Sequence, residues 1–476
     1  MTQSYHAHPL TIFFNLTRVV YLILIPVMRG FVGALRGDFA AWLRGAWIDI
    51  LIMLLMVLIA VWRWWRITYA FDGRGISITS GSYYRRYTRI SWNKVTTISV
   101  IRPLSLSLFH AVRLRADTLG GSFKDADFSI LLTPKRAEAI LCLLREPRLP
   151  DSPKDYVPPT RSILALALLT SNSFAGVVFI ATFISQAGKL LGNEFSQRLI
   201  GTVEEAARTF SFGFISPAAA VLALLLLAGW LIAFVRVFVR YKNMSVSRRR
   251  NTYSIRGGVL THREYSIASG DVNFADITQS LFTKILRLYS LYISAVGYGK
   301  QKDDISCIIP TENETRFGHY LETLFPGLRP SPRQFAPPRT GFMRFLAQPL
   351  VPCLAIPLAM GILLYLFPDW TSFILFVCLM SMLPSLIFLL VRFFDFRTGG
   401  LSFDGKNYTM RYSKGISLHT VVVPADRIVL IELRQSIWQR FGDNCDLYIS
   451  TMAEERSVHL CRNLRAKELR GLFHLN

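Results

Sequence analysis

The chain has 476 residues, with 54 Lys and Arg against 31 Asp and Glu, a formal net charge of +23 and a mean hydropathy of +0.34. Hydrophobic residues make up 51% and charged residues only 18%, which excludes a soluble nucleic-acid-binding protein and a disordered basic protein. Six Cys and 30 Gly exclude a disulfide-rich scaffold and a collagen. A chain that is both basic and apolar is typical of an integral membrane protein with sizeable parts in water.

Six stretches are apolar over the roughly 20 residues that a membrane-spanning helix needs. These predicted spans are residues 10–28, 45–62, 162–185, 214–235, 346–367 and 370–391. Arg18 lies inside the first, so a helix that lies in the membrane interface is the alternative there.

The spans come in pairs, and a long mixed segment follows each pair. The domains predicted from this rhythm are hairpins at 1–62, 162–235 and 346–391, and water-exposed segments at 63–161, 236–345 and 392–476. Two crossings return the chain to its starting side, so all three exposed segments and the N-terminus are predicted to share one side.

The positive charges indicate which side this is. The three exposed segments carry net charges of +9, +9 and +4, which together account for 22 of the 23 excess charges. Because basic residues collect on the cytoplasmic side, the exposed segments are predicted to be cytoplasmic. We expect a multi-pass protein of the bacterial inner (plasma) membrane with a cytoplasmic N-terminus.

The three exposed segments are predicted to be repeats of one another. Apolar columns recur at offsets of 177 and 156 residues, for example Leu104, Leu281 and Ile437, and Leu108, Ile285 and Phe441. Each segment contains short alternating strands and ends in a helical pattern, at 136–145, 316–325 and 466–473. The predicted fold class is α+β, with each repeat a small β-barrel closed by a C-terminal helix.

Several local features resemble a known family. His8-Pro9 precedes the first span, Trp64-Trp65-Arg66 follows the second, and Gln279-Ser280 recurs as Gln435-Ser436. In these features the chain resembles the YdbS/YdbT-type bacterial membrane proteins with pleckstrin-homology-like (PH-like) domains. The resemblance implies a PH-like fold for each repeat and a place in the membrane, more than any activity. The first repeat departs from the pattern, because Arg102-Pro103 replaces the Gln-Ser pair.

The sequence contains no HExxH, Walker-type GxxxxGK[ST] or GxSxG motif. The eight His residues are scattered singly, without metal-ligand spacing to a second His or Cys. We therefore expect no catalytic residue, no metal and no cofactor, and predict that the protein is not an enzyme.

Basic clusters are the strongest chemical signal. One comprises Arg85, Arg86 and Arg89, and the other is the run Arg248, Arg249 and Arg250. Lys and Arg near a membrane attract anionic lipids by about 1 kcal/mol per residue, so these six residues are predicted to contact the membrane surface. The alternative is that they only reflect cytoplasmic topology. No stacking aromatic residues accompany them, so nucleic acid is not an expected partner.

The sequence favours a scaffold whose PH-like domains bind lipid headgroups or a protein, with anionic membrane lipids or another membrane protein as partners. The alternative is a transporter or lipid-moving protein that uses the six-helix bundle. A polar path lined by Asn15, Asp49, Asn172 and Ser173 would support that alternative.

Overall fold

The computed structural model describes residues 4–17, 47–81, 84–118, 120, 126–144, 155–171, 197–198, 201–202, 205, 217–249, 251–299, 304–452 and 458–473. It divides into two compact units. The first comprises Met1–Ser152 with Leu260–Ala268, and the second Pro153–Val259 with Ser269–Asn476.

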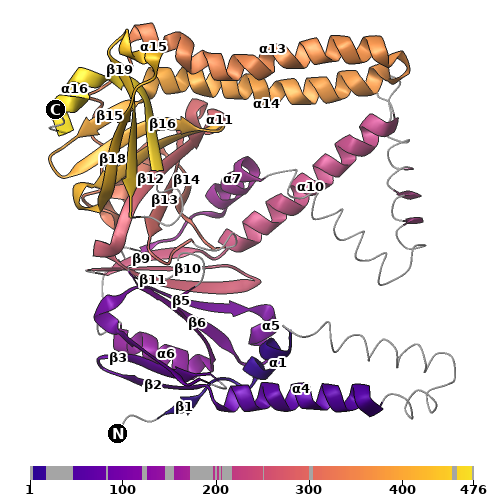
Figure 1. Ribbon diagram of the computed structural model, residues 1–476, viewed down its shortest axis with the longest axis vertical. Helices are drawn as coiled ribbons and strands as arrows, with labels where there is room; N and C mark the ends of the chain where they lie inside the picture. Colours follow the sequence, from indigo (N-terminus) through magenta and orange to yellow (C-terminus); the bar gives the residue numbers. More distant parts are fainter. Residues whose placement is uncertain are drawn as a thin grey trace. The chain divides into compact units, whose positions relative to one another are not determined.

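Three described helices are long and apolar enough to cross a membrane: α10 (Pro217–Tyr241), α13 (Phe342–Leu366) and α14 (Thr371–Thr398). They correspond to the predicted spans at 214–235, 346–367 and 370–391. Helices α13 and α14 form an antiparallel hairpin closed by the short turn η4 (Pro368–Trp370), as Figure 1 shows.

The other three predicted spans are described only in part. Shorter apolar helices lie at α1 (Leu10–Thr17), α4 (Trp47–Trp65) and α7 (Thr160–Thr170). Residues 18–46 and 172–196 lie outside the described residues, so the structure does not test whether 10–28 and 162–185 cross a membrane.

The first unit contains the first repeat, built from two sheets. One sheet has the order β1-β2-β3-β4, with β1 Tyr5–His6, β2 Thr68–Asp72, β3 Gly75–Ser80 and β4 Arg86–Ser91. In the other, β7-β6-β5-β11 are neighbours, with β7 Phe128–Leu132, β6 Val112–Thr118, β5 Val95–Pro103 and β11 Thr261–Ala268. A short helix, α5 (Leu104–Ser107), joins β5 to β6, and α6 (Pro134–Leu144) ends the repeat. Tyr69, Val100, Leu114 and Ile140 lie in the core between these elements.

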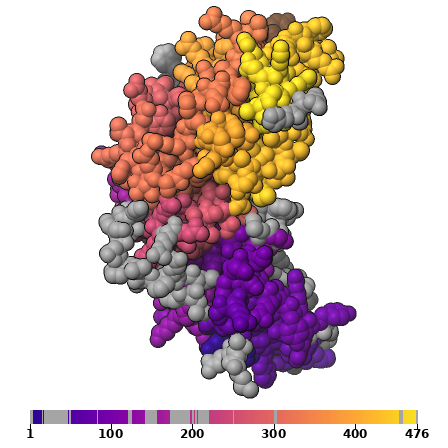
Figure 2. Space-filling model, turned by 90° about the vertical axis from the view of Figure 1, so that its left-hand side faces the viewer, coloured from indigo at the N-terminus to yellow at the C-terminus, as the bar shows by residue number. Residues whose placement is uncertain are grey.

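The second unit contains the remaining two repeats. The second repeat consists of β9 Ser245–Arg249, β10 Thr252–Gly257, β12 Val272–Ser280, α11 Leu281–Ile285, β13 Leu288–Ala295, β14 Cys307–Asn313 and α12 Glu314–Leu324, with β8 Asp155–Tyr156 beside β9. The third consists of β15 Gly400–Phe403, β16 Asn407–Lys414, β17 Ser417–Pro424, β18 Ile428–Arg434, α15 Ile437–Arg440, β19 Asn444–Thr451, β20 Val458–Arg465 and α16 Ala466–Phe473. Figure 2 shows the salmon second repeat and the gold third repeat adjoining on one face of this unit.

The strands do not close into the predicted barrels, because a strand of one repeat pairs with a strand of the next. Strand β5 of the first repeat pairs with β11, which belongs by sequence to the second repeat. In the second unit, β12 pairs with β17 of the third repeat, giving the sheet order β14-β13-β12-β17-β16-β15. The edge that closure of a barrel would use is therefore occupied by the following repeat.

The two exchanged pairings have the same register. Ile98 lies opposite Ser266 in the first, and Ala275 lies opposite Val422 in the second. Ala275 follows Ile98 by 177 residues, and Val422 follows Ser266 by 156 residues, which are the offsets that relate the apolar columns. The junction between consecutive repeats is thus itself repeated.

Backbone geometry also supports the predicted internal repeat. His110, Arg287 and Asp443 each follow the short helix of their repeat, and they have left-handed φ values of 52°, 52° and 49°. These three positions are again separated by 177 and 156 residues. A non-glycine residue rarely adopts this conformation, so its recurrence indicates one conserved turn geometry in all three repeats.

Candidate functional site

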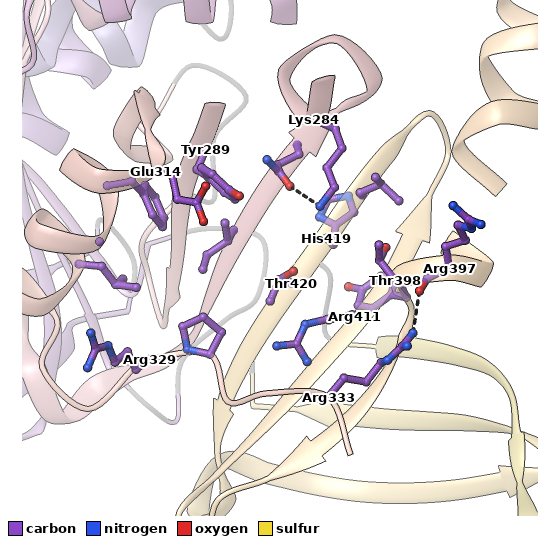
Figure 3. A pocket seen from close by; sticks show the side chains of 18 residues that line it. Lys284, Tyr289, Glu314, Arg329, Arg333, Arg397, Thr398, Arg411, His419 and Thr420 are labelled. Carbon is purple, nitrogen blue, oxygen red and sulfur yellow. Dashed lines mark hydrogen bonds between the residues drawn. The ribbon is translucent and has the colours of Figure 1, made fainter. Parts of the chain in front are cut away.

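A cavity of about 570 Å³ lies between the second and third repeats, within the second unit (Figure 3). Its walls come from β12, β13, α11 and α12 on one side and from β16, β17 and the end of α14 on the other. Five cationic side chains line it: Lys284, Arg329, Arg333, Arg397 and Arg411. Glu314 is the one carboxylate among the lining residues, so the described walls are strongly positive.

Backbone contacts hold two of these cations in place. Arg333 lies on the segment between α12 and α13, and its Nη1 donates to the carbonyl oxygens of Arg397 at 2.7 Å and Gly399 at 3.3 Å. Arg411 lies on β16, and its Nη2 donates to the carbonyl oxygen of Ser331. These contacts leave the positive charges without a carboxylate partner at hydrogen-bond distance in the described contacts.

Lys284 extends from α11 into the same cavity. Its Nζ donates to Oε1 of Gln279 at 3.3 Å, and Figure 3 shows Lys284 at the cavity wall. Burial, and then the charge of Arg411, lower the pKa of Lys284. Burial, and then the charge of Arg333, lower the pKa of Arg411, whose buried Nη1 has no hydrogen-bond partner among the described residues. The cations therefore oppose one another, and a bound anion would relieve this repulsion.

A second group of polar residues ties the two repeats together behind the cavity. Nδ1 of His419 lies 2.9 Å from Oδ2 of Asp276, across the β12–β17 pairing. Tyr412 pairs through its hydroxyl with Nδ1 of His459 at 2.9 Å. Burial lowers the pKa of His459 to about 4, so this ring is neutral near pH 7. The first pair joins the second repeat to the third, and the second pair lies within the third repeat, so each gives a buried polar atom a partner.

A buried ion cluster fixes α14 against the third repeat. Oδ2 of Asp395 lies 3.5 Å from Nη1 of Arg392 and 3.6 Å from Nη1 of Arg462, and it accepts a hydrogen bond from Ser413 at 2.7 Å. Nη2 of Arg392 also donates to Gln348 of α13 at 2.8 Å. Since α14 is held on both sides, its last turn presents Arg397 to the cavity at a defined place.

The structure separates the arginines that the sequence singled out. Arg85, Arg86 and Arg89 are exposed on the first repeat, and Arg89 lies 3.6 Å from a carboxylate oxygen of Asp72. Arg86 pairs with Ser80, next to the β3–β4 connection.

The arginine run of the second repeat occupies a different place. Arg249 pairs with Thr252 at the β9–β10 turn, the end of β9 that is remote from α10. The guanidinium of Arg248 lies 5.8 Å from the ring centre of Tyr253, and Arg250 lies outside the described residues. None of the five residues that the structure describes lines the cavity, and contact of all six with lipid stays a prediction.

Sequence reasoning missed the cavity because its cations are dispersed over more than a hundred residues. Arg397 was visible as a basic residue after the last span, and Arg411 as one of few cations in its hairpin. Nothing in their spacing indicates that both meet Lys284, since the exchange of strands between repeats brings them together.

Across the described ranges, no three His, Cys, Asp or Glu side chains gather into a possible metal site. The polar path suggested for a transporter is untested, because the side chains of Asn15, Asp49, Asn172 and Ser173 lie outside the described part.

Comparisons with known proteins agree with this architecture. The family model "Bacterial PH domain" matches the chain three times, at residues 19–148, 197–315 and 354–474. The chain is also similar to the UPF0699 transmembrane protein YdbT of Bacillus subtilis (strain 168), with 19% identity over 489 residues, covering 97% of this chain and 94% of that protein. No solved structure matches it.

Proposed function

Because the chain belongs to the bacterial PH-domain family and carries that domain three times in a membrane protein, we propose that it is a non-enzymatic membrane scaffold that binds an anionic lipid headgroup. The observation that carries the proposal is the cavity between the second and third repeats, which five cations and one carboxylate line; one of these cations, Arg329, is paired with Glu322. A phosphate group would offer acceptors to the unpartnered Nη1 of Arg411 and to Lys284.

The position of the cavity along α14 suits a lipid headgroup. About 30 Å of helix separates Thr371, at the start of α14, from Val391, which is the thickness of the hydrocarbon core. Arg397 lies about 9 Å further along, at the depth of the headgroups. A lipid whose chains stay in the bilayer could therefore reach the cavity with its phosphate.

The proposal includes the topology in which it would work. We take the three PH-like repeats to lie on the cytoplasmic side of the inner membrane, with six spans in three hairpins. Three long apolar helices and the excess of basic residues in the repeats support this arrangement.

The test compares binding to the purified full chain in neutral detergent micelles. Thermal stability is followed while phosphatidylglycerol, phosphatidylcholine or free glycerol phosphate is added. We expect phosphatidylglycerol to stabilise the chain, and Lys284→Met to remove most of that stabilisation. Lys414→Met is the matched control, because Lys414 is exposed on the neighbouring hairpin and does not line the cavity.

The outcomes separate the possible ligands. If glycerol phosphate stabilises the chain as much as phosphatidylglycerol does, the ligand is a free phosphate compound and not a lipid. A specific headgroup site would be contradicted if Lys284→Met and Lys414→Met lost equal stabilisation by phosphatidylglycerol. It would also be contradicted if phosphatidylcholine stabilised the chain as much as phosphatidylglycerol.

A further inference from the structure

One apolar column of the repeat is exposed in all three copies. Leu108, Ile285 and Phe441 lie at the same position, just after or at the end of the short helices α5, α11 and α15. Their exposed fractions are 76%, 66% and 85%. A repeated apolar position that is buried in no copy has no role in the core of the repeat, which indicates that something outside the described chain covers it.

The exposed apolar surface extends around each short helix. Its other members are Leu104 and Phe109 in the first repeat, Phe282 and Leu286 in the second, and Ile437 and Trp438 in the third. Each repeat thus presents a compact apolar tip, defined here as the exposed hydrophobic residues of its short helix and the turn that follows.

Each apolar tip is fixed next to one of the apolar helices. In the first unit, Leu106 of α5 packs with Leu10 and Phe14 of α1. In the second unit, Leu281 of α11 packs with Ile387 and Val391 of α14.

The third tip is fixed by polar contacts instead. Arg344, in the first turn of α13, donates from Nη1 to the hydroxyl of Ser436, which caps α15, at 3.0 Å. Its Nη2 lies 3.0 Å from a carboxylate oxygen of Asp446. Although the contacts differ in kind, the second and third tips both lie at the end of the α13–α14 hairpin that is remote from its connecting turn (Figure 1).

The length of the hairpin places this end at the boundary of the hydrocarbon core when its connecting turn lies at the opposite boundary. Val391, on which α11 rests, lies about 30 Å along α14 from its start. Arg344 lies about 33 Å along α13 from its far end at Leu366. A side chain that extends from α11 or α15 at this level would meet the region where acyl chains give way to headgroups.

We propose that the three apolar tips are membrane-interface anchors, which insert their exposed side chains into the lipid surface beside the spans. Trp438 is of the aromatic type enriched at this interface, and Phe441, Phe282 and Phe109 are typical of the apolar face of elements that lie in it. Exposed cations flank two tips, Arg287 after α11 and Arg440 in α15, and both could pair with lipid phosphates. The anchors would hold each repeat against the bilayer at a fixed height. The proposal does not depend on what the cavity binds.

The experiment measures contact between each tip and lipid in the full chain reconstituted in phospholipid nanodiscs. Phe441→Cys and Ile285→Cys are labelled with an environment-sensitive fluorophore, and lipids with a nitroxide high on the acyl chain are included as quenchers. We expect both labels to lose most of their emission. Both positions are exposed, so the substitutions leave the packing of the core unchanged.

The matched control is Val429→Cys. Val429 is 62% exposed and apolar, and it lies on β18, the strand that leads to α15, but at the opposite end of that strand. Its label should keep its emission in the same nanodiscs, and the unsubstituted chain measures background labelling of the native cysteines. Quenching at 441 and 285 no stronger than at 429 would overturn the proposal. Shielding of these labels that persists in lipid-free detergent and increases with protein concentration would also overturn it, because a second protein would then cover the tips.

Discussion

Two clusters of cations meet near the end of α14, and they differ in how their charge is balanced. Arg392 and Arg462 share the buried carboxylate of Asp395, supported by Ser413. On the cavity side, Lys284 and Arg411 have neutral hydrogen-bond partners. The first cluster is complete within the chain, and the second has an excess of positive charge.

The difference indicates separate roles for similar residues. A buried ion pair that is internally compensated connects one element to another, and here it joins a membrane helix to the third repeat. A group of half-buried cations whose pKa values are lowered by burial and by a neighbouring positive charge is unfavourable until an anion arrives. Removing the carboxylate of the first cluster should therefore destabilise the chain, whereas adding one to the second should not.

The largest effect is expected from removing the internal carboxylate. Asp395→Asn leaves the buried Arg392 and the half-buried Arg462 without this counter-charge, so the free energy of unfolding should fall by about 3–5 kcal/mol. Chemical denaturation of the purified chain in micelles measures this. Asp426→Asn is the control, since Asp426 pairs with Arg427 at an exposed site and should change little. An Asp395→Asn chain as stable as the control would show that the cluster does not hold α14.

The second-largest effect on stability is expected at acid pH, where protonation of His459 places a positive charge beside the buried hydroxyl of Tyr412. Burial lowers the pKa of His459 to about 4, from an ordinary value near 6.5. The unfolded chain therefore binds this proton first, so stability is complete above about pH 6.5 and declines as the pH falls toward 4. The decline should reach about 3 kcal/mol. His459→Gln, which can still accept from Tyr412, should flatten this part of the profile of melting temperature against pH. An unchanged slope would assign the acid sensitivity to groups other than His459.

The cavity can also be given a carboxylate of its own. Thr420 lines it on β17, so Thr420→Glu should supply the missing negative charge and weaken the binding of phosphatidylglycerol by about 1–2 kcal/mol. Without lipid, this variant should be at least as stable as the parent chain. Thr420→Gln has nearly the same size without the charge and should retain binding. If both variants lose binding equally, the cause is steric and the charge argument fails.

The smallest effect concerns the Gln-Ser pair. The side-chain amide of Gln435 donates to the carbonyl oxygen of Asn444 at 2.9 Å, and Gln279 makes the same bond to Leu288. These bonds brace the turn around each short helix, so Gln435→Ala should cost about 1 kcal/mol of stability. Arg102, the equivalent residue in the first repeat, instead lies near Glu138. Arg102→Ala should therefore cost less in the same denaturation measurement, and an equal cost would argue against a bracing role for the Gln.

The sequence predicted the features that depend on local pattern. The long apolar helices at 217–241, 342–366 and 371–398 follow from uninterrupted hydrophobic runs, and the repeat follows from its apolar columns. The exchange of strands could not be predicted, since β5 has the same alternation whether its partner is its own repeat or β11. The same is true of the exposed column, because the pattern shows that Ile285 and Phe441 are apolar but not that they face outward.

The candidate site was hidden for a related reason. A run such as Arg248-Arg249 is conspicuous in the sequence, yet it lies at a hairpin turn. Lys284 and Arg411 stand alone in the sequence and become neighbours only through the pairing of β12 with β17. Distant pairing, which no local pattern encodes, decides which charges act together.

The exchanged strands also impose an order on how the protein is made. Strand β5 emerges from the ribosome long before β11, its outer neighbour, and the second hairpin is synthesised in the interval. The first repeat must therefore wait with an unpaired edge until β11 has been made, and the second waits in the same way for β17. Each domain is completed by its successor, so maturation of the repeats is coupled to synthesis of the apolar helices that lie between them.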